Sequence, residues 1–223
     1  YYFGRLLRNT LTISLSSLIF GFPMPIIFAL LLNEVRNSKF KRTIQTVTYM
    51  PHFISLVVMC SLIRLFVADT GIIVQLMPKF GFEPVALLSK KEYFVPIYVL
   101  SGIWQGFGWD SIIYLSALTA IDPGLYEAAT IDGANRFQKV WYISLTGIAS
   151  TISILLILNI GSIMNNGFEQ IYMFQNPLNI ATSEVFETYI YKVGLKNTEF
   201  SYSTAVGLFK SVVNAVFVII ANR

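Results

Sequence analysis

Long apolar runs recur through the whole chain, and they constrain its fold more than any other feature. An α-helix rises 1.5 Å per residue, so about 20 apolar residues cross the roughly 30 Å hydrocarbon core of a bilayer. Charged residues make up 13% of the sequence, whereas about 25% is usual in soluble domains. We therefore predict an all-α, polytopic membrane helical bundle that forms one transmembrane domain over residues 1–223, with spans at approximately 11–32, 44–66, 94–118, 148–167 and 202–220.

Helix-breaking residues interrupt the first two runs. Gly21, Pro23 and Pro25 lie within the first, where proline removes a backbone donor and clashes with the preceding turn. We expect a kink or a break there, covered by protein or by a cavity, because open backbone is not tolerated against lipid. Pro51 stands near the start of the second run, and polar residues interrupt the third and fourth.

The charges between the runs predict which segments share a side of the membrane. The short segment 33–42 holds four basic residues against one acidic residue, and such loops stay in the cytoplasm. Alternation then places 119–147 inside as well, and the longer segments 67–93 and 168–201 outside. Some basic residues oppose this assignment by falling on the outer side: Arg5, Arg8, Lys79, Lys90 and Lys91.

Several kinds of site are excluded by residue counts. The single cysteine, Cys60, cannot form an intrachain disulfide or a cysteine-rich metal site, and it lies in an apolar run as a buried structural thiol would. The net charge of +4 is spread over the loops, so we predict no nucleic-acid surface. The phosphate-binding pattern G-x-x-x-x-G-K-[ST] does not occur in the sequence. The sequence therefore predicts no nucleotide-binding site of this kind.

The segment 119–147 is a polar interruption between two apolar runs, and it begins with a helix-start signal. Asp122 is a good N-cap and Pro123 suits the first helical position, where its missing N–H does no harm. Gly133 supplies the left-handed residue that ends a helix. Asp132 is expected to fold its carboxylate onto nearby backbone N–H groups in that turn.

A second helix is predicted directly after this turn. Asn135, followed three residues later by Gln138, resembles a capping box. We therefore expect a helix, a glycine turn and a second helix that begins near Arg136. An ordinary ordered loop that joins two spans remains the alternative.

This segment resembles the EAA loop in the permease subunits of binding-protein-dependent ABC importers. The family pattern reads E-A-A-x-x-D-G-A, then five free positions, then F-x-x-I-x-L-P. The chain departs from it at Val140, where phenylalanine is usual, and at Thr146, where proline is usual, so the second helix is expected to run on without a kink. It matches at Glu127, Ala128, Ala129, Asp132, Gly133, Ala134, Ile143 and Leu145.

Other stretches resemble the maltose-type sugar permeases, especially those that take up oligosaccharides and polysaccharide fragments. They are 49–58, 167–174, 183–195 and 204–214. Members of that family usually have six or more spans, so the resemblance implies that a first span is missing before Tyr1.

The resemblance also implies partners and a location. The chain would be a multi-pass subunit of a bacterial cytoplasmic membrane, not itself an enzyme and without its own cofactor. ATP and magnesium would be bound by a cytoplasmic ATPase dimer, whose motion the EAA loop receives as a coupling helix. Glu127 is the residue best placed to pair with an ATPase arginine. A second permease subunit, usually a distinct one, and an extracellular binding protein that delivers the oligosaccharide would complete the complex.

Polar residues within the spans are the candidates for a substrate path, because buried polar groups in a membrane usually serve a function. Amides, carboxylates and indole rings suit the hydroxyls and apolar faces of sugars. Lys210 is predicted to pair with Asp110 or to extend towards the membrane interface; the general alternative is that such residues bind neighbouring helices. The candidates are Trp104, Gln105, Trp109 and Asp110 in the third run, Asn159, Ser162, Asn166 and Glu169 on one face of a helix in the fourth, and Lys210 and Asn214 in the fifth.

Three other functions remain open at this point. The same architecture serves amino acids or peptides in other importers. A secondary transporter would need no ATPase. An integral membrane enzyme would need a catalytic constellation in a span, whereas the chain has a single histidine, His52, to which we assign no role, and only scattered acids.

Overall fold

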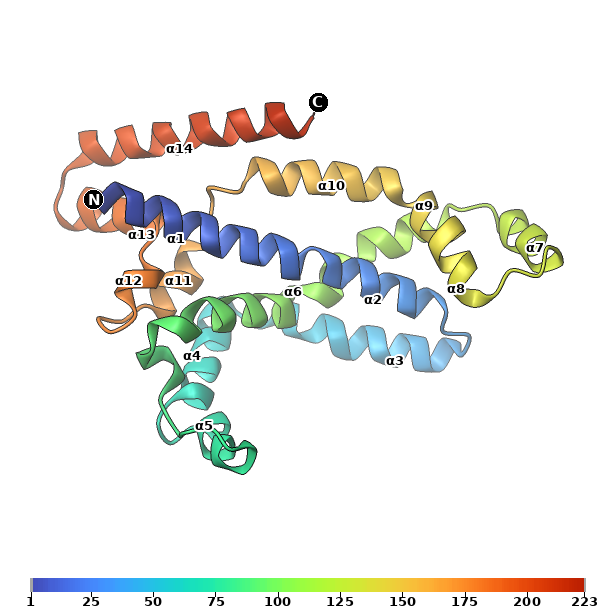
Figure 1. The fold of residues 1–223 in the computed structure, drawn as a ribbon, viewed down its shortest axis with the longest axis horizontal. Helices are drawn as coiled ribbons and strands as arrows, with labels where there is room; N and C mark the ends of the chain where they lie inside the picture. Colours follow the sequence, from blue (N-terminus) through green and yellow to red (C-terminus); the bar gives the residue numbers. More distant parts are fainter. Residues whose placement is uncertain (1, 223) are drawn as a thin grey trace.

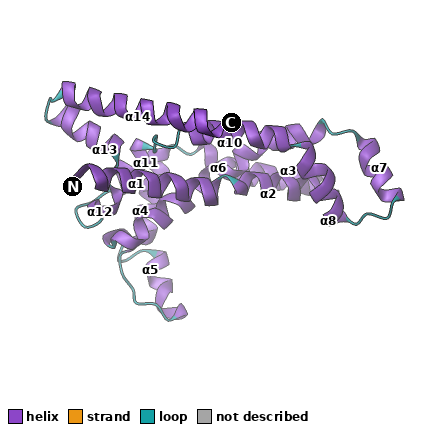
Figure 2. Ribbon diagram, turned by 45° about the horizontal axis from the view of Figure 1, so that its top comes forward, coloured by secondary structure: helices purple, strands orange, loops and turns teal. Residues whose placement is uncertain are grey.

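A computed structural model describes residues 2–222, and every regular element in that range is helical (Figures 1 and 2). The all-α prediction is therefore confirmed. The longer elements are α1 (Tyr2–Ser16), α2 (Pro23–Asn33), α3 (Ser38–Tyr49), α4 (Leu56–Val67), α6 (Phe94–Thr119), α7 (Pro123–Ile131), α10 (Ala149–Gly161) and α14 (Phe200–Ala221). The shorter ones are α5 (Ile72–Leu76), α8 (Arg136–Lys139), α9 (Leu145–Gly147), α11 (Phe168–Phe174), α12 (Ile180–Ser183) and α13 (Phe186–Ile190), with further single turns between them.

Three helical segments are long and apolar enough to cross a membrane: Tyr2–Asn33, Leu56–Phe80 and Phe200–Ala221. A fourth is counted if the bent pair Arg136–Gly147 and Ala149–Gly161 acts as one span. The predicted third span is a helix of 26 residues, α6, which lies at the centre of the bundle alongside α2 (Figure 1).

The first predicted span begins earlier than expected and contains no break. Helix begins at Tyr2 and continues to Asn33 as one segment of 32 residues. Instead of a break, a π-helical turn at Ser17–Gly21 precedes Pro23. A wider turn gives room for the proline ring and leaves its missing N–H without consequence.

The second predicted span, 44–66, is wrong as one helix. α3 ends at Tyr49, a 3₁₀ turn carries Pro51, and Ile54 is extended. Ser55 then caps α4 by accepting a hydrogen bond from the Val58 N–H at 3.3 Å. α4 turns away from the bundle direction (Figure 1), because proline and a new cap together end one helix and start another.

α3 and α6 approach so closely that only glycine fits at their contact. A β-carbon built on Gly108 would lie 2.2 Å from the carbonyl oxygen of Thr48. We expect Gly108→Ala to push α3 away from α6 and to lower the free energy of unfolding by about 1–3 kcal/mol. Thermal unfolding of the purified protein in detergent measures this loss. Gly102→Ala, on the same helix with open space at its β-carbon, is the matched control and should change stability little.

The fourth predicted span, 148–167, is also shorter and more bent than expected. α10 ends at Gly161, and the chain is irregular until Phe168. The helix Arg136–Gly147, which precedes α10 and contains a π-helical turn at Val140–Ser144, meets α10 at a bend of 59°. The prediction of a straight run without proline at position 146 is therefore wrong. The bend falls at buried Ile148, whose φ of −100° and ψ of 6° leave the helical range.

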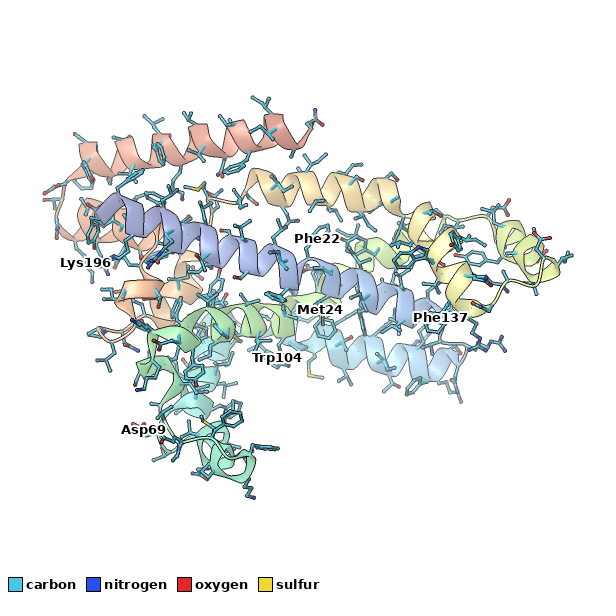
Figure 3. All side chains as sticks on the ribbon, viewed as in Figure 1. Phe22, Met24, Asp69, Trp104, Phe137 and Lys196 are labelled. Carbon is cyan, nitrogen blue, oxygen red and sulfur yellow. The ribbon has the colours of Figure 1, made fainter. Side chains whose placement is uncertain are left out.

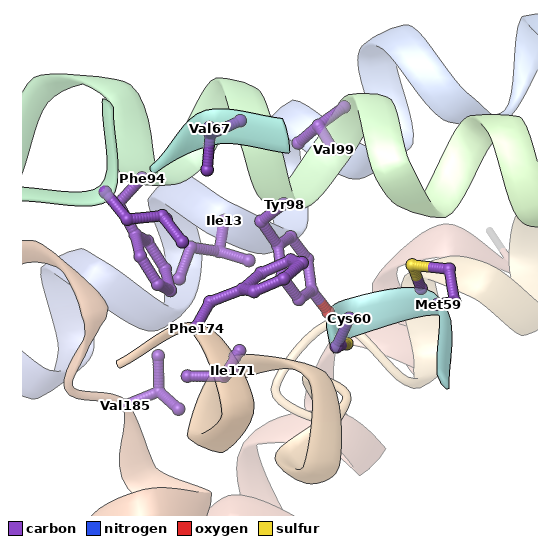
Figure 4. Close-up of a cluster of buried hydrophobic side chains, with 11 residues drawn as sticks. Ile13, Met59, Cys60, Val67, Phe94, Tyr98, Val99, Ile171, Phe174 and Val185 are labelled. Atoms are coloured by element: carbon purple, nitrogen blue, oxygen red, sulfur yellow. The ribbon is translucent and has the colours of Figure 1, made fainter. Parts of the chain in front are cut away.

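The segment 168–201 is a folded cap of short helices instead of an open loop. Its apolar residues Ile171, Phe174 and Val185 are buried in one cluster with Ile13 of α1 and Phe94 of α6 (Figure 4). Cys60 belongs to the same cluster, which confirms that its thiol is buried. Long-range apolar packing therefore orders a segment whose sequence lacks a long periodic helix.

A buried carboxylate fastens this cap to the start of α1. Glu184 is 1% exposed and accepts hydrogen bonds from the Tyr2 hydroxyl, from Arg5 Nη2 at 2.8 Å and from Lys192 Nζ at 2.8 Å. Burial alone would raise the pKa of this carboxyl, but the hydrogen bonds from Lys192 and Tyr2 and the nearby positive charges hold the pKa below its usual value. The Glu184 carboxyl therefore stays ionised at neutral pH and keeps the cap anchored to α1.

The prediction that segments 33–42 and 119–147 lie on the same side of the membrane agrees with the arrangement of the chain. The turn between α2 and α3 and the whole of α7–α8 lie at one end of the molecule, whereas α11–α13 lie at the opposite end, beside the start of α1 (Figure 1). The two segments assigned to the cytoplasm therefore share an end.

Candidate functional site

The first candidate site is the projecting elbow formed by α7 and α8. α7 begins as predicted: Asp122 Oδ1 accepts a hydrogen bond from the Gly124 N–H at 2.9 Å, and Pro123 occupies the first turn. No residue of α7 is buried. A nine-residue helix without a buried residue is marginal in water, so local bonds are needed to hold the ends of this helix.

The glycine turn supplies those bonds at the far end of α7. Gly133 has a φ of +79°, the left-handed conformation that closes a helix. Its N–H donates to the Thr130 carbonyl at 3.1 Å, and the Ala134 N–H donates to the Ala129 carbonyl at 2.8 Å. These two bonds are the pair that defines a Schellman motif, so the turn is a specified structure.

α8 starts directly behind the turn with the predicted capping box. The Gln138 N–H donates to Asn135 Oδ1 at 2.9 Å, and the Asn135 N–H donates to Gln138 Oε1 at 2.7 Å. Both helix starts and the glycine turn are thus confirmed.

Two side-chain bonds, absent from the sequence reasoning, brace the elbow. Lys139 Nζ donates to Thr130 Oγ1 at 2.7 Å, joining α8 to α7. The hydroxyls of Tyr126 and Ser144 lie 2.9 Å apart, and Ser144 is buried against the bundle. These bonds tie α7 to α8 and to the helix that leads into α10.

The elbow exposes large apolar side chains on its surface. Ile131 and Phe137 are each 88% exposed (Figure 3 labels Phe137). Glu127 and Asp132 are also exposed. The predicted role of Asp132 in the turn is wrong: its N–H donates to Ala128, but among residues 2–222 its carboxylate accepts no hydrogen bond. That carboxylate is therefore open to solvent or to a partner.

The second candidate site is an open cavity of about 460 Å³ lined by residues of α1, α2, α6, α10 and α11 and of the segments between them. Four of the predicted path residues line it: Asp110, Asn159, Ser162 and Asn166. The reason given for the last three was wrong, because the helix ends at Gly161 and the residues do not share one helical face. The irregular backbone after α10 brings them together instead.

The remaining predicted path residues lie away from this cavity and make structural contacts or lie exposed. Trp104 is 44% exposed and Glu169 is exposed, and neither is among the residues that line the cavity. Their observed contacts are Gln105 Nε2 to the Ile54 carbonyl at 3.0 Å, the Trp109 ring stacked on His52 with centroids 4.4 Å apart, and Asn214 Oδ1 accepting from the Met164 N–H at 2.9 Å. Gln105, Trp109 and Asn214 therefore bind neighbouring segments of the chain, which is the alternative to a role in the substrate path.

Lys210 does not pair with Asp110, as was predicted, but with Glu187 of α13. Lys210 Nζ lies 2.5 Å from Glu187 Oε1, and both side chains are nearly buried. The same oxygen accepts a hydrogen bond from the Asn166 N–H at 3.1 Å. The ion pair therefore ties α14 to the cap and to the wall of the cavity.

Several cavity residues were missed by the sequence reasoning. They are Ser14, Ser17, Tyr98, Asn165 and Gln170. Ser14 Oγ donates to Asn166 Oδ1 at 2.7 Å across the cavity wall. Small hydroxyls on an apolar helix carry little signal in a sequence, and only the contact between distant segments identifies them.

Comparisons with known proteins place this geometry among transport proteins. Residues 6–223 match the family described as "Binding-protein-dependent transport system inner membrane component". The polygalacturonan/rhamnogalacturonan transport system permease protein YteP of Bacillus subtilis is 49% identical over 99% of this chain and 69% of its own length. The arabinooligosaccharides transport system permease protein AraP of the same organism is 30% identical over 99% of this chain and 71% of its own length.

The fold is also similar to a solved transporter. A chain in the crystal structure of a bacterial ABC transporter that imports the acidic polysaccharide alginate superposes with a TM-score of 0.95 at 43% identity, covering 99% of this chain and 77% of that one. A second structure shows that transporter in complex with an alginate pentasaccharide-bound periplasmic protein.

Proposed function

The chain belongs to the family of binding-protein-dependent transport system inner membrane components, and on that premise we propose that it is the permease subunit that moves oligosaccharides through an ATP-driven importer. The most similar relatives include proteins named for polygalacturonan, rhamnogalacturonan and arabino-oligosaccharides, and the similar structure imports alginate. These polymers include both acidic and neutral sugars. The proposal therefore names fragments of polysaccharides as the substrate class and leaves the charge of the sugar open.

The elbow is proposed as the element that couples this subunit to a cytoplasmic ATPase dimer. The observation that supports this most is an exposed apolar tip on a short, capped and braced helix pair. Burying Ile131 and Phe137 in a groove would remove apolar area from water, while Glu127 and Asp132 are available for ion pairs at its rim. The Tyr126–Ser144 contact would pass the movement into the bundle.

The cavity is proposed as this subunit's part of the substrate path. Hydroxyl and amide groups alternate with Phe22, Phe107 and other apolar residues in its lining, a combination that suits the hydroxyls and the apolar faces of a sugar ring. A second, distinct permease subunit would supply the facing half, and an extracellular binding protein would deliver the oligosaccharide.

Co-purification tests the coupling proposal. We expect the tagged permease to retain the ATPase subunit during purification from the membrane, and Ile131→Asp to lose at least about nine-tenths of it, because a charge replaces an apolar contact at the centre of the interface. Leu195→Asp, at an exposed apolar residue at the opposite end of the bundle, is the matched control and should retain it. Equal retention by Ile131→Asp and wild type would contradict the assignment of the elbow.

A further inference from the structure

Among residues 2–222, Asp110 is the one charged residue in the lining of the cavity described above. Its predicted partner, Lys210, is engaged with Glu187. His52 is stacked on Trp109 and does not line the cavity. Within residues 2–222 the Asp110 carboxylate takes part in no ion pair and accepts no hydrogen bond from a side chain or a backbone N–H. The cavity therefore contains a carboxylate that is exposed in this subunit and has no ion-pair or hydrogen-bond partner among those residues.

Three polar side chains in the same lining donate hydrogen bonds to other groups of the protein. Gln170 Nε2 donates to the Tyr98 carbonyl at 3.1 Å and to Ser101 Oγ at 2.8 Å. Asn159 Nδ2 donates to the Leu155 carbonyl at 2.8 Å, and Ser162 Oγ donates to the Asn159 carbonyl at 3.1 Å. These three side chains offer a ligand mainly their acceptor oxygens, whereas the hydroxyls of Ser17 and Tyr114 and the amide of Asn165 in the same lining can also donate.

Sugar units differ in what they demand from such a lining. A neutral unit presents hydroxyls, which donate readily to carboxylate and amide oxygens. A uronate unit also presents a carboxylate, which only accepts hydrogen bonds and is repelled by a like charge where water is scarce. A lining that holds one unpaired carboxylate and, among its described residues, no cationic side chain therefore favours the first and disfavours the second.

We propose that Asp110 makes this cavity select for uncharged, hydroxyl-bearing sugar units and against uronate units. The proposal rests on the assignment of the cavity to the path of an oligosaccharide. It assigns Asp110 a role in specificity, because the carboxylate would contact the sugar directly. Charge selection here would act after the binding protein has released its ligand.

Binding to the purified importer in lipid nanodiscs, without the binding protein, tests the selection. The two probes are the trisaccharide of galacturonate and its methyl ester, which share rings and linkages but differ in charge. Saturation-transfer NMR at neutral pH measures the affinity of each. We expect the wild-type complex to bind the methyl ester roughly tenfold more tightly than the acid, as a partly screened like-charge repulsion implies.

Two variants separate charge from shape. Asp110→Asn keeps the size of the side chain and should bring the ratio of affinities close to one, while continued binding of the methyl ester shows that the cavity is intact. Asn159→Asp adds a second carboxylate to the same lining and should widen the ratio. Glu34→Gln, a charge outside the cavity, should leave it unchanged.

Each result decides between the two proposals. An unchanged ratio in Asp110→Asn, with both sugars still bound, would overturn charge selection and leave the substrate class standing. If the wild-type complex binds neither probe and the binding-protein-driven system imports no oligosaccharide, the substrate class fails and the selection fails with it.

Discussion

Gly133→Val is expected to abolish oligosaccharide uptake while the protein remains folded in the membrane and its ATPase partner continues to hydrolyse ATP. A β-carbon at this position meets no atom within 4 Å, so packing is unaffected. The cost arises from the backbone, because a φ of +79° strains any residue with a β-carbon by about 1–2 kcal/mol and strains a β-branched one most. Relief of that strain would break the two Schellman hydrogen bonds and loosen the end of α7.

Uptake of labelled sugar and ATP hydrolysis, measured in the same proteoliposomes, report this uncoupling. Gly81→Val is the matched control, since Gly81 has a φ of +80°, also meets nothing within 4 Å, and lies outside the elbow. It carries the same local strain and should leave uptake near the wild-type level. Normal uptake by Gly133→Val would mean that the elbow is only a connector between two helices.

Lys210→Met is expected to be the most destabilising single change considered, at about 3–5 kcal/mol. The substitution keeps the length of the side chain but leaves the Glu187 carboxylate nearly buried without a counter-charge. Glu187 Oε2 already lacks a hydrogen-bond partner among the described residues. The Asn166 N–H on Oε1 is then the main remaining support of the charge, and the wall of the cavity would shift with it.

Unfolding in detergent, followed as a function of temperature or of added SDS, measures the loss. The double variant Lys210→Met with Glu187→Gln removes both charges and should recover most of the stability, because a neutral pair avoids the cost of an isolated buried charge. Asp110→Asn combined with Lys210→Met should recover none of it. Recovery in that second combination would restore the pairing of Lys210 with Asp110.

The elbow was predictable from the sequence because every signal in it is local. Asp122 and Asn135 bond to backbone atoms two or three residues away, and Gly133 closes its helix through residues on the same turn. Such bonds need no tertiary partner. The role of Asp132 was the exception, because a short carboxylate next to a glycine turn has several local options and took none of them.

Helix breaks and contact partners were much less predictable. The π-helical turn before Pro23, the bend at Ile148 and the end of α10 at Gly161 depend on which neighbouring segments fill the space around the break. Hydropathy over a long window averages across such breaks, which explains the two spans that were predicted too long. Side-chain partners such as Glu187 for Lys210 lie 23 residues apart, and no periodic pattern connects them.

By itself the sequence determined that the chain is a membrane helical bundle, that 119–147 forms a capped helix–turn–helix and that the latter resembles a coupling loop. Those properties follow from average apolarity and from hydrogen bonds within a few residues. Only the tertiary structure decided that 168–201 is a packed cap and that Lys210 forms an ion pair with Glu187. It also decided that Asp110 lines a cavity with Asn159 and Asn166 and has no ion-pair partner among the described residues. These properties depend on which distant segments meet, because a charge or an amide acquires its role from the groups that surround it after folding.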